Sequence, residues 1–350
     1  QYSQYINHIY SKYTDRVEPF GLDESWLDVT GSTGLFGDGL KIANQISSEV
    51  KAQTGLTLSI GVSFNKILAK LGSDMKKPDA ITVLDEQNWK EKAWPLPVGD
   101  LLYVGRKTEA KLQSRYVRTI GELEQVGEKT LCDWFGVIGS MLHGFANGAD
   151  FSPVALEGTQ EPIKSIGNSS TTRRDLVNDP EVLLWVTAMA ESVASRLIES
   201  GFAATKFSIS VRRNDMSGFS RQCSVAVPTF LTKDIIDNCM RLFKRHNDWG
   251  RDLPIRHIGV RAFGLMPANA PRQLTLDYSA SKMRELEELE RTVIRLRQRF
   301  GNNIIQRGIM FSDPVLAGLD VKGEHTIHPT GLLTGGGVLQ WRNWSMKLTA

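Results

Sequence analysis

The first 85 residues alternate between segments with helical and with extended spacing of their apolar residues. Segment 38–54 carries apolar residues at helical intervals, whereas segment 56–62 alternates apolar and polar residues as a half-buried strand does. The buried face predicted for each consists of Leu40, Ala43, Ile46 and Val50 in the helix and of Leu56, Leu58, Ile60 and Val62 in the strand. Further strands are predicted over 24–30 and 80–84, and a further helix over 64–75. Strands separated by helices favour a mixed sheet with helices packed against it.

Residues 86–155 contain short helical segments and an internal repeat. Val104-Gly105-Arg106-Lys107-Thr108 recurs as Val126-Gly127-Glu128-Lys129-Thr130. A glycine turn that opens a helix presents free backbone N–H groups, which suit a phosphate oxygen. The first copy is the better phosphate site, because Arg106 and Lys107 attract an anion that Glu128 would repel. The alternative is an ordinary loop-to-helix transition.

Residues 163–277 predict a βαββαβ arrangement. Its segments are strand 163–168, helix 180–200, strands 204–213 and 218–227, helix 232–248 and strand 255–265. Along 206–212, the apolar Phe207, Ile209 and Val211 alternate with Lys206, Ser208, Ser210 and Arg212. Lys206 and Arg212 therefore share a polar face, which either contacts a nucleic-acid backbone or is simply solvated. The polar segment 156–162 predicts a linker before this domain.

A final helix is predicted over 280–300. Its apolar residues form one stripe of Leu286, Leu289, Val293, Leu296 and Phe300. We expect this stripe to pack on the preceding domain or on a partner helix.

Composition and charge narrow the class of protein. The 350 residues are 41% hydrophobic and 23% charged, without an apolar run of membrane-spanning length. No signal peptide is visible, and the three cysteines lack the spacing of a metal site or a disulfide framework, so we expect a cytoplasmic protein. Residues 1–162 carry 16 basic and 21 acidic side chains, whereas residues 163–350 carry 26 and 18. The basic second half favours a polyanionic partner, although chance can also produce such a difference.

Adjacent carboxylates at Asp23 and Glu24 precede the first predicted strand core. Neighbouring carboxylates repel each other unless a cation lies between them, and a divalent metal is the natural partner. A basic segment follows, from Gly61 through Lys70 to Lys77, and contains the helix predicted over 64–75. Carboxylates for a metal and lysines for phosphates are the arrangement expected for phosphoryl transfer on a nucleotide.

Two segments resemble signatures of one family. They are Asp23-Glu24-x-x-Leu27-Asp28-Val29-Thr30 and Gly61-x-Ser63-x-Asn65-Lys66-x-Leu68-Ala69-Lys70, the second followed by Ser73-Asp74 and Lys77-Pro78. Both are similar to palm motifs of the Y-family (DinB/UmuC-type) translesion DNA polymerases. The resemblance implies an α+β fold with five parts: a partial palm (1–85), a helical thumb with helix–hairpin–helix elements (86–155), a linker (156–162), a DNA-binding little finger (163–277) and an unassigned C-terminal helix and tail (278–350).

The resemblance also implies roles for particular residues. Asp23 and Glu24 would hold two Mg²⁺ ions, and Lys77 would contact the triphosphate of the incoming nucleotide. Asp28 is expected to be structural. The residues expected to contact DNA are Gly105, Arg106, Lys107 and Thr108 in the thumb and Lys164, Arg173, Arg174, Lys206 and Arg212 in the little finger.

A short motif near the end of the little finger suggests another partner. Gln273, Leu274 and Leu276 resemble the peptide by which bacterial polymerases dock on the replication sliding clamp. Asp277 stands where an aromatic residue is usual, and a chance match is the alternative.

The resemblance implies a bacterial DNA-directed DNA polymerase. It would copy primer–template DNA past damaged bases in DNA repair, using deoxynucleoside triphosphates. The first metal motif and the fingers of the family have no counterpart here, so we expect a fragment that is inactive by itself. One alternative is a non-catalytic, polymerase-like DNA-binding accessory protein in repair. The other, an unrelated nucleotidyl- or phosphotransferase, is disfavoured by the lack of a Walker loop.

Overall fold

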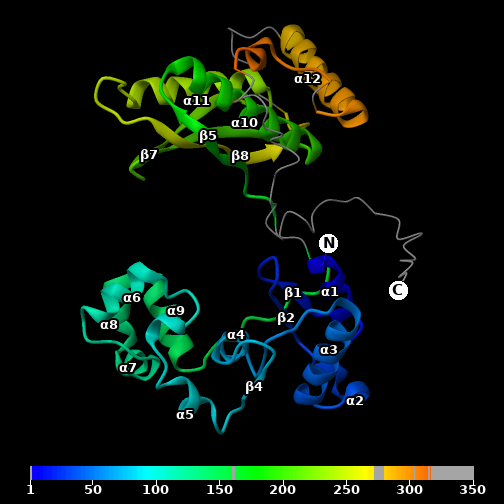
Figure 1. Cartoon of the computed structure of the whole chain (residues 1–350), viewed down its shortest axis with the longest axis vertical. Coiled ribbons are helices and arrows are strands. Elements are labelled where there is room, and N and C mark those ends of the chain that lie inside the picture. Colours follow the sequence, from blue (N-terminus) through cyan, green and yellow to red (C-terminus); the bar gives the residue numbers. More distant parts are fainter. Residues whose placement is uncertain (1, 160–161, 272–279, 303, 314–315, 317–350) are drawn as a thin grey trace. The chain divides into compact units, whose positions relative to one another are not determined.

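The computed structural model describes residues 2–159, 162–271, 280–302, 304–313 and 316. The described residues up to 159 belong to one compact unit, and those from 162 onward belong to a second (Figure 1). The division falls within the range in which the sequence predicts a linker.

The first unit begins with helices around a short hairpin. Its elements are α1 (Tyr2–Tyr10), the antiparallel strands β1 (Val17–Pro19) and β2 (Ser25–Leu27), the 3₁₀ turn η1 (Thr30–Ser32), α2 (Thr33–Phe36) and α3 (Gly39–Thr54). α3 starts where the Asp38 side chain accepts a hydrogen bond from the Lys41 amide, and it ends at Gly55, whose φ is 72°. The helix prediction is confirmed here, except that Leu40 is exposed.

The strands that follow are shorter than predicted. β3 (Ile60–Ser63) pairs in parallel with β4 (Ile81–Leu84), and α4 (Lys66–Met75) crosses between them. A strand needs a neighbour for its backbone hydrogen bonds, and β4 offers one only to Ile60–Ser63. The strand predicted over 56–62 is therefore wrong at its start, where Leu56 is exposed, and the strand predicted over 24–30 shrinks to β2. Among the described residues, the strands of this unit form two separate pairs and not one mixed sheet.

Gly61 allows α4 to approach β3 closely. A Cβ atom at Gly61 would lie 1.8 Å from Ala69 O and 2.6 Å from the Ser73 amide nitrogen. On the facing helix, a Cβ atom at Gly72 would lie 3.3 Å from Gly61 Cα. No side chain fits at residue 61, so this glycine sets the distance between the basic helix and its strand.

The rest of the first unit is helical. It comprises α5 (Trp89–Ala93), η2 (Val98–Asp100), α6 (Arg106–Gln113), α7 (Ile120–Gln125), α8 (Glu128–Phe135) and α9 (Val137–Ala146). Leu68, Leu71 and Leu84 share one buried cluster with Leu112 and Leu142, so the core continues across the predicted boundary at residue 85.

Asn65 makes a polar connection within the same unit. Its Oδ1 accepts a hydrogen bond from the Leu68 amide at 2.9 Å, which caps α4, and its Nδ2 donates to Gly148 O at 2.8 Å, just after α9.

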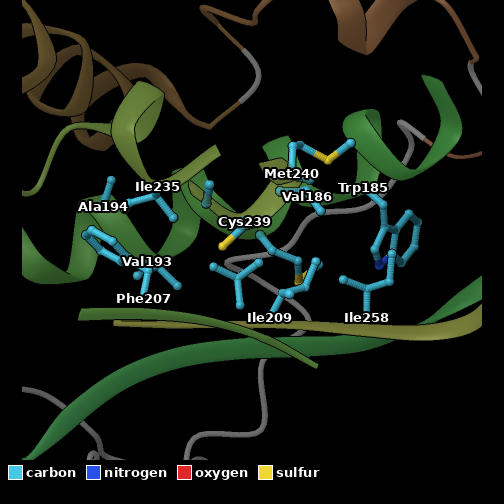
Figure 2. Close-up of a cluster of buried hydrophobic side chains, with 14 of the residues drawn as sticks. Trp185, Val186, Val193, Ala194, Phe207, Ile209, Ile235, Cys239, Met240 and Ile258 are labelled. Carbon is cyan, nitrogen blue, oxygen red and sulfur yellow. The ribbon is translucent and has the colours of Figure 1, made fainter. Parts of the chain in front are cut away.

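The second unit is a four-stranded antiparallel sheet with helices on one face. Its elements are β5 (Ser165–Leu176), α10 (Asp179–Glu199), β6 (Phe202–Arg213), β7 (Gly218–Thr229), α11 (Thr232–His246) and β8 (Ile255–Pro267), with strand order β5-β8-β6-β7. α10 and α11 cover one face, and Figure 2 shows Phe207, Ile209 and Cys239 in the apolar layer between sheet and helices. The βαββαβ prediction matches this order of elements, but β5 is longer than predicted and contains Arg173 and Arg174.

α12 (Ala280–Phe300) packs on the second unit and is followed by η3 (Gly308–Phe311). The predicted helix is confirmed, but the predicted stripe is not the face that is buried on the preceding domain, and its packing on a partner helix stays a prediction. Met283 and Ile294 are buried, whereas Leu289 and Phe300 of the predicted stripe are exposed. The physical reason is that ion pairs orient the helix, as between Arg297 Nη2 and Glu191 Oε1 at 3.1 Å.

Candidate active site and nucleic-acid interface

Asp23 and Glu24 lie in the tight turn of the β1–β2 hairpin. The amides of Phe20 and Gly21 both donate to Glu24 O, at 2.9 and 3.3 Å, and close the turn. The Trp26 ring packs on Phe20 with 4.6 Å between ring centroids, and its Nε1 donates to Lys66 O at 3.0 Å. The hairpin is thereby fixed to the start of α4.

The two carboxylates converge on the space beside Gly21. A Cβ atom placed on Gly21 would lie 3.8 Å from Asp23 Oδ1 and 3.9 Å from Glu24 Oε2. Asp23 is exposed and Glu24 is half-buried, so both carboxylates are accessible to a ligand. Asp23 and Glu24 are thus neighbours in the sequence whose carboxylates also lie near each other in space.

A series of alternating charges extends from Glu24 along α4. Lys70 Nζ lies 2.9 Å from Glu24 Oε1 and 2.7 Å from Asp74 Oδ2, and Lys77 Nζ lies 2.7 Å from Asp74 Oδ1. Burial by itself raises the pKa of Asp74, but the hydrogen bonds from Lys70 and Lys77 outweigh it and lower that pKa below its usual value. Burial likewise lowers the pKa of Lys70, but its hydrogen bonds to Asp74 and Glu24 leave that pKa raised. We call Lys70, Asp74 and Lys77 the α4 charge ladder.

Two residues of the charge ladder, Lys70 and Asp74, were not among the site residues predicted from the sequence. Lys70 is 16% exposed and Lys77 is 56% exposed, so Lys70 braces Glu24 while Lys77 extends into solvent. The signal for Lys70 and Asp74 was their spacing of four residues on one helix face, which also fits an ordinary solvated pair.

Lys66, one turn before Lys70, has a different environment. Its Nζ lies 2.6 Å from Glu18 Oε2, and that oxygen also accepts from the Ala155 amide at 2.8 Å. The ion pair of Lys66 with Glu18 therefore helps to link β1 to the segment that contains Ala155.

Asp23 and Glu24 match the chemistry of a divalent-metal site in part. Carboxylate oxygens are the ligands that hard divalent cations prefer. Within the described ranges, however, no three His, Cys, Asp or Glu side chains group so that they could hold a metal ion. The hairpin thus supplies two carboxylate ligands.

The first glycine turn of the predicted thumb has the geometry of a helix N-terminus. Gly105 is the N-cap residue of α6 in an extended conformation, and no side chain caps it. Arg106 and Lys107 are exposed beside it, and Thr108 is partly buried. Tyr103, two residues before Gly105, has a φ of 71°, a conformation that favours glycine.

The sheet of the second unit has a polar face opposite α10 and α11. Directly paired residues share a face, so the open face that carries Lys206 and Arg212 also carries their neighbours on β8. Arg261 lies opposite Ser208, and His257 lies opposite Arg212. Lys206, Arg212 and Arg261 are exposed there, as is Lys164 just before β5. The sequence prediction missed Arg261, although the alternation along 255–265 contains it.

Arg174 has two intramolecular partners. Its guanidinium lies 3.0 Å from Glu181 Oε1 and 2.6 Å from Asp313 Oδ2. Arg174 lies within the stretch between Thr171 and Leu176 in which the β5–β8 pairing shifts register. Arg173 also has intramolecular interactions. Gln273, Leu274 and Leu276 lie outside the described residues.

Comparison with known proteins assigns the chain to a family. Residues 1–74 match the model of the impB/mucB/samB family, and residues 163–276 match that of its C-terminal domain. DNA polymerase IV of Acetivibrio thermocellus is 44% identical over 313 residues, covering 89% of this chain and 78% of that protein. DNA polymerase IV 1 of Bacillus subtilis is 35% identical over 301 residues, covering 86% and 71%.

A solved structure supports the fold. The Y-family DNA polymerase chimera Dbh-Dpo4(243-245)-Dbh matches 76% of each chain with a TM-score of 0.64 and 20% identity. Fold and matches together define an α+β DNA-directed DNA polymerase. The chain belongs to the DinB/UmuC-type Y-family, in the group of proteins called DNA polymerase IV. In the part of the chain that the structure describes, no helix is long and apolar enough to cross a membrane.

Proposed function

We propose that this protein synthesises DNA on a template past damaged bases, with Asp23 and Glu24 as ligands of the catalytic metal. The observation that carries the proposal is the convergence of Asp23 Oδ1 and Glu24 Oε2 beside Gly21, next to the α4 charge ladder. The expected metal is Mg²⁺, which would activate the primer hydroxyl and stabilise charge on the pyrophosphate.

The chain's own residues position the reactants. Lys70 fixes the orientation of Glu24 through the 2.9 Å ion pair and is itself fixed by Asp74. Lys77, at the exposed end of the ladder, would bind the triphosphate of an incoming deoxynucleotide, and its exposure supports this role.

Two surfaces would hold the primer–template. The amides and cations of Gly105, Arg106, Lys107 and Thr108 suit a phosphate at the start of α6. Lys206, Arg212 and Arg261 on the open sheet face, with Lys164 nearby, suit a sugar–phosphate backbone that is held without reading of sequence. A clamp contact at 273–276 and a cytoplasmic location stay predictions.

Primer extension by the natural protein that contains this chain tests the metal assignment. Asp23→Asn and Glu24→Gln keep the size of each side chain and remove its charge, and we expect each to lower the extension rate by about 10²-fold or more. Asp28→Asn is the matched control, since Asp28 Oδ1 accepts from the Thr30 amide at 3.0 Å and has a local structural role. Extension that survives both Asp23→Asn and Glu24→Gln contradicts the assignment.

The non-catalytic alternative makes a different prediction in the same assay. An accessory protein would bind primer–template DNA, but the wild-type protein would not extend it at any Mg²⁺ concentration.

A further inference from the structure

A row of directly paired residues crosses the open sheet face near the β6–β7 turn. It consists of Thr171 on β5, His257 on β8, Arg212 on β6 and Gly218 on β7. Because cross-strand partners lie on one face, the whole row lies on the face opposite α10 and α11 (Figure 1). Thr171 and Arg212 are exposed, and His257 is half-buried. The row thus places a hydroxyl, an imidazole and a guanidinium side by side on three adjacent strands.

The contact between Thr171 and His257 suits either charge state of the imidazole. Thr171 Oγ1 lies 3.3 Å from His257 Nδ1. A hydroxyl both donates and accepts, so it can donate to Nδ1 of the neutral ring or accept from Nδ1–H of the charged ring. Nε2 of His257 has no hydrogen-bond partner among the residues that the structure describes. That nitrogen is therefore available to donate to a ligand.

The charges around His257 keep its ring neutral in the free chain. Burial lowers the pKa of His257 below its usual value, and the nearby Arg212 guanidinium lowers it further. Arg173 and Asp175 lie further along β5, and Asp175 Oδ1 lies 3.3 Å from Arg256 Nη1. An anion bound beside Arg212 would reverse the effect of that guanidinium and favour the charged ring.

The next row along the sheet is low enough for a polymer to approach. Its members are small residues, namely Ser169, Gly259, Ser210 and Ser220. A Cβ atom at Gly259 would lie 2.5 Å from Ser210 Oγ and 2.8 Å from Ser169 Cβ, so no side chain fits there. Hydroxyls and closely approached strands suit a sugar–phosphate backbone that lies across the sheet beside the row of His257.

We propose that Thr171, His257 and Arg212 bind one backbone phosphate of the DNA, and that His257 takes up a proton from water as this phosphate binds. Arg212 and His257 Nε2–H donate to the phosphate oxygens. The added proton resides on Nδ1, which then donates to Thr171 Oγ1. This inference rests on the proposed DNA binding by the open sheet face, and it adds a subsite at which that binding is coupled to pH.

The coupling has a definite sign. A bound phosphate raises the pKa of His257, so the complex holds this proton more readily than the free chain does. The affinity for DNA should therefore increase as the pH falls through the pKa of the complex, and level off below the pKa of the free chain. A rise of one unit in this pKa corresponds to a tenfold gain in affinity, and we expect a gain of about tenfold between about pH 8 and about pH 6.

Binding of a labelled primer–template duplex to the complete chain tests this coupling. Fluorescence anisotropy at constant ionic strength should show the gain for the wild type, and His257→Gln should abolish it. His246→Gln is the matched control, because His246 belongs to α11 on the opposite face, and it should keep the gain. His257→Arg carries a permanent charge and should bind at about pH 8 nearly as tightly as the wild type does at about pH 6. A gain of equal size in His257→Gln overturns the proposal.

The wild-type chain also tests the subsite without a substitution. In NMR spectra of a chain with isotope-labelled histidine, the pKa of His257 should rise by about one unit when the duplex is added. DNA binding that leaves this pKa unchanged or lowers it overturns the subsite alone. A chain that binds no duplex at any pH contradicts the proposed function together with the subsite.

Discussion

Lys70 Nζ lies 2.9 Å from Glu24 Oε1, although 46 residues separate them along the chain. This ion pair joins the hairpin that carries the acidic residues to the helix that carries the basic ones. Lys70→Met keeps most of the length of the side chain and removes the charge, so we expect primer extension to fall about 10²-fold while the chain stays folded. The measurement is single-nucleotide incorporation at saturating primer–template.

Lys66→Met provides the comparison for that variant. Lys66 pairs with Glu18 and not with Glu24, so its loss should lower the free energy of unfolding by about 1–3 kcal/mol with little effect on incorporation by the folded enzyme. If Lys66→Met lowered incorporation as much as Lys70→Met, the pairing of Lys70 with Glu24 would not explain the loss.

Gly61→Ala should be strongly destabilising. The added methyl group would meet Ala69 O at 1.8 Å, so α4 must move away from β3 or the backbone must distort. We expect a loss of about 3 kcal/mol or more in the free energy of unfolding, measured by chemical denaturation. Gly34→Ala in α2 is the control, because no atom lies within 4 Å of its Cβ position. It should be neutral or stabilise the chain by up to about 1 kcal/mol.

Neutralising the open sheet face should weaken DNA binding without unfolding the second unit. The triple variant Lys206→Gln, Arg212→Gln, Arg261→Gln removes three exposed cations from that face. We expect lower affinity for primer–template DNA, and a plot of log affinity against log salt that is less steep by about 2 to 3. Arg174→Gln should instead leave this slope unchanged and lower stability, because Arg174 pairs with Glu181 and Asp313. An unchanged slope in the triple variant would show that this face of the sheet does not contact DNA.

Acid should remove the stabilisation that Asp74 provides. Its pKa is lowered in the folded chain, so the unfolded chain binds this proton more readily. The contribution of Asp74 is fully present above the unfolded pKa of about 3.9 and is lost as the pH falls through the lower folded pKa. The difference in unfolding free energy between wild type and Asp74→Asn should therefore be constant near neutral pH and shrink in strong acid. If the difference in unfolding free energy grew as the pH fell, the pKa of Asp74 could not be lower in the folded chain than in the unfolded chain.

The sequence predicted the elements with long, regular spacing best. α3, α11, α12 and the strands of the second unit each repeat an apolar period over many residues, and each was predicted to within a few residues at most of its ends, apart from β5. The ends of β2 and β3 were predicted poorly, because a strand stops where its neighbour stops and spacing does not report the neighbour. β5 was underestimated for a related reason, since its pairing shifts register near its end.

The candidate site was predictable only where residues are adjacent in sequence. Asp23 and Glu24 adjoin each other, so their proximity could be inferred from the chain itself. Two of the ion pairs join segments that are distant in sequence, Lys70 with Glu24 and Arg174 with Asp313. The spacing of residues within one segment cannot predict such pairs. Arg261 was missed because a single cation in a strand becomes informative only when the strand beside it is known.

Asn65 performs two tasks with one amide group, since its oxygen caps α4 and its nitrogen holds Gly148 O. Aspartate at this position would keep the acceptor and lose the donor. Such a change would leave the basic helix properly started while releasing the segment after α9. The mobility of that segment relative to the hairpin can thus be altered separately from the acidic residues themselves.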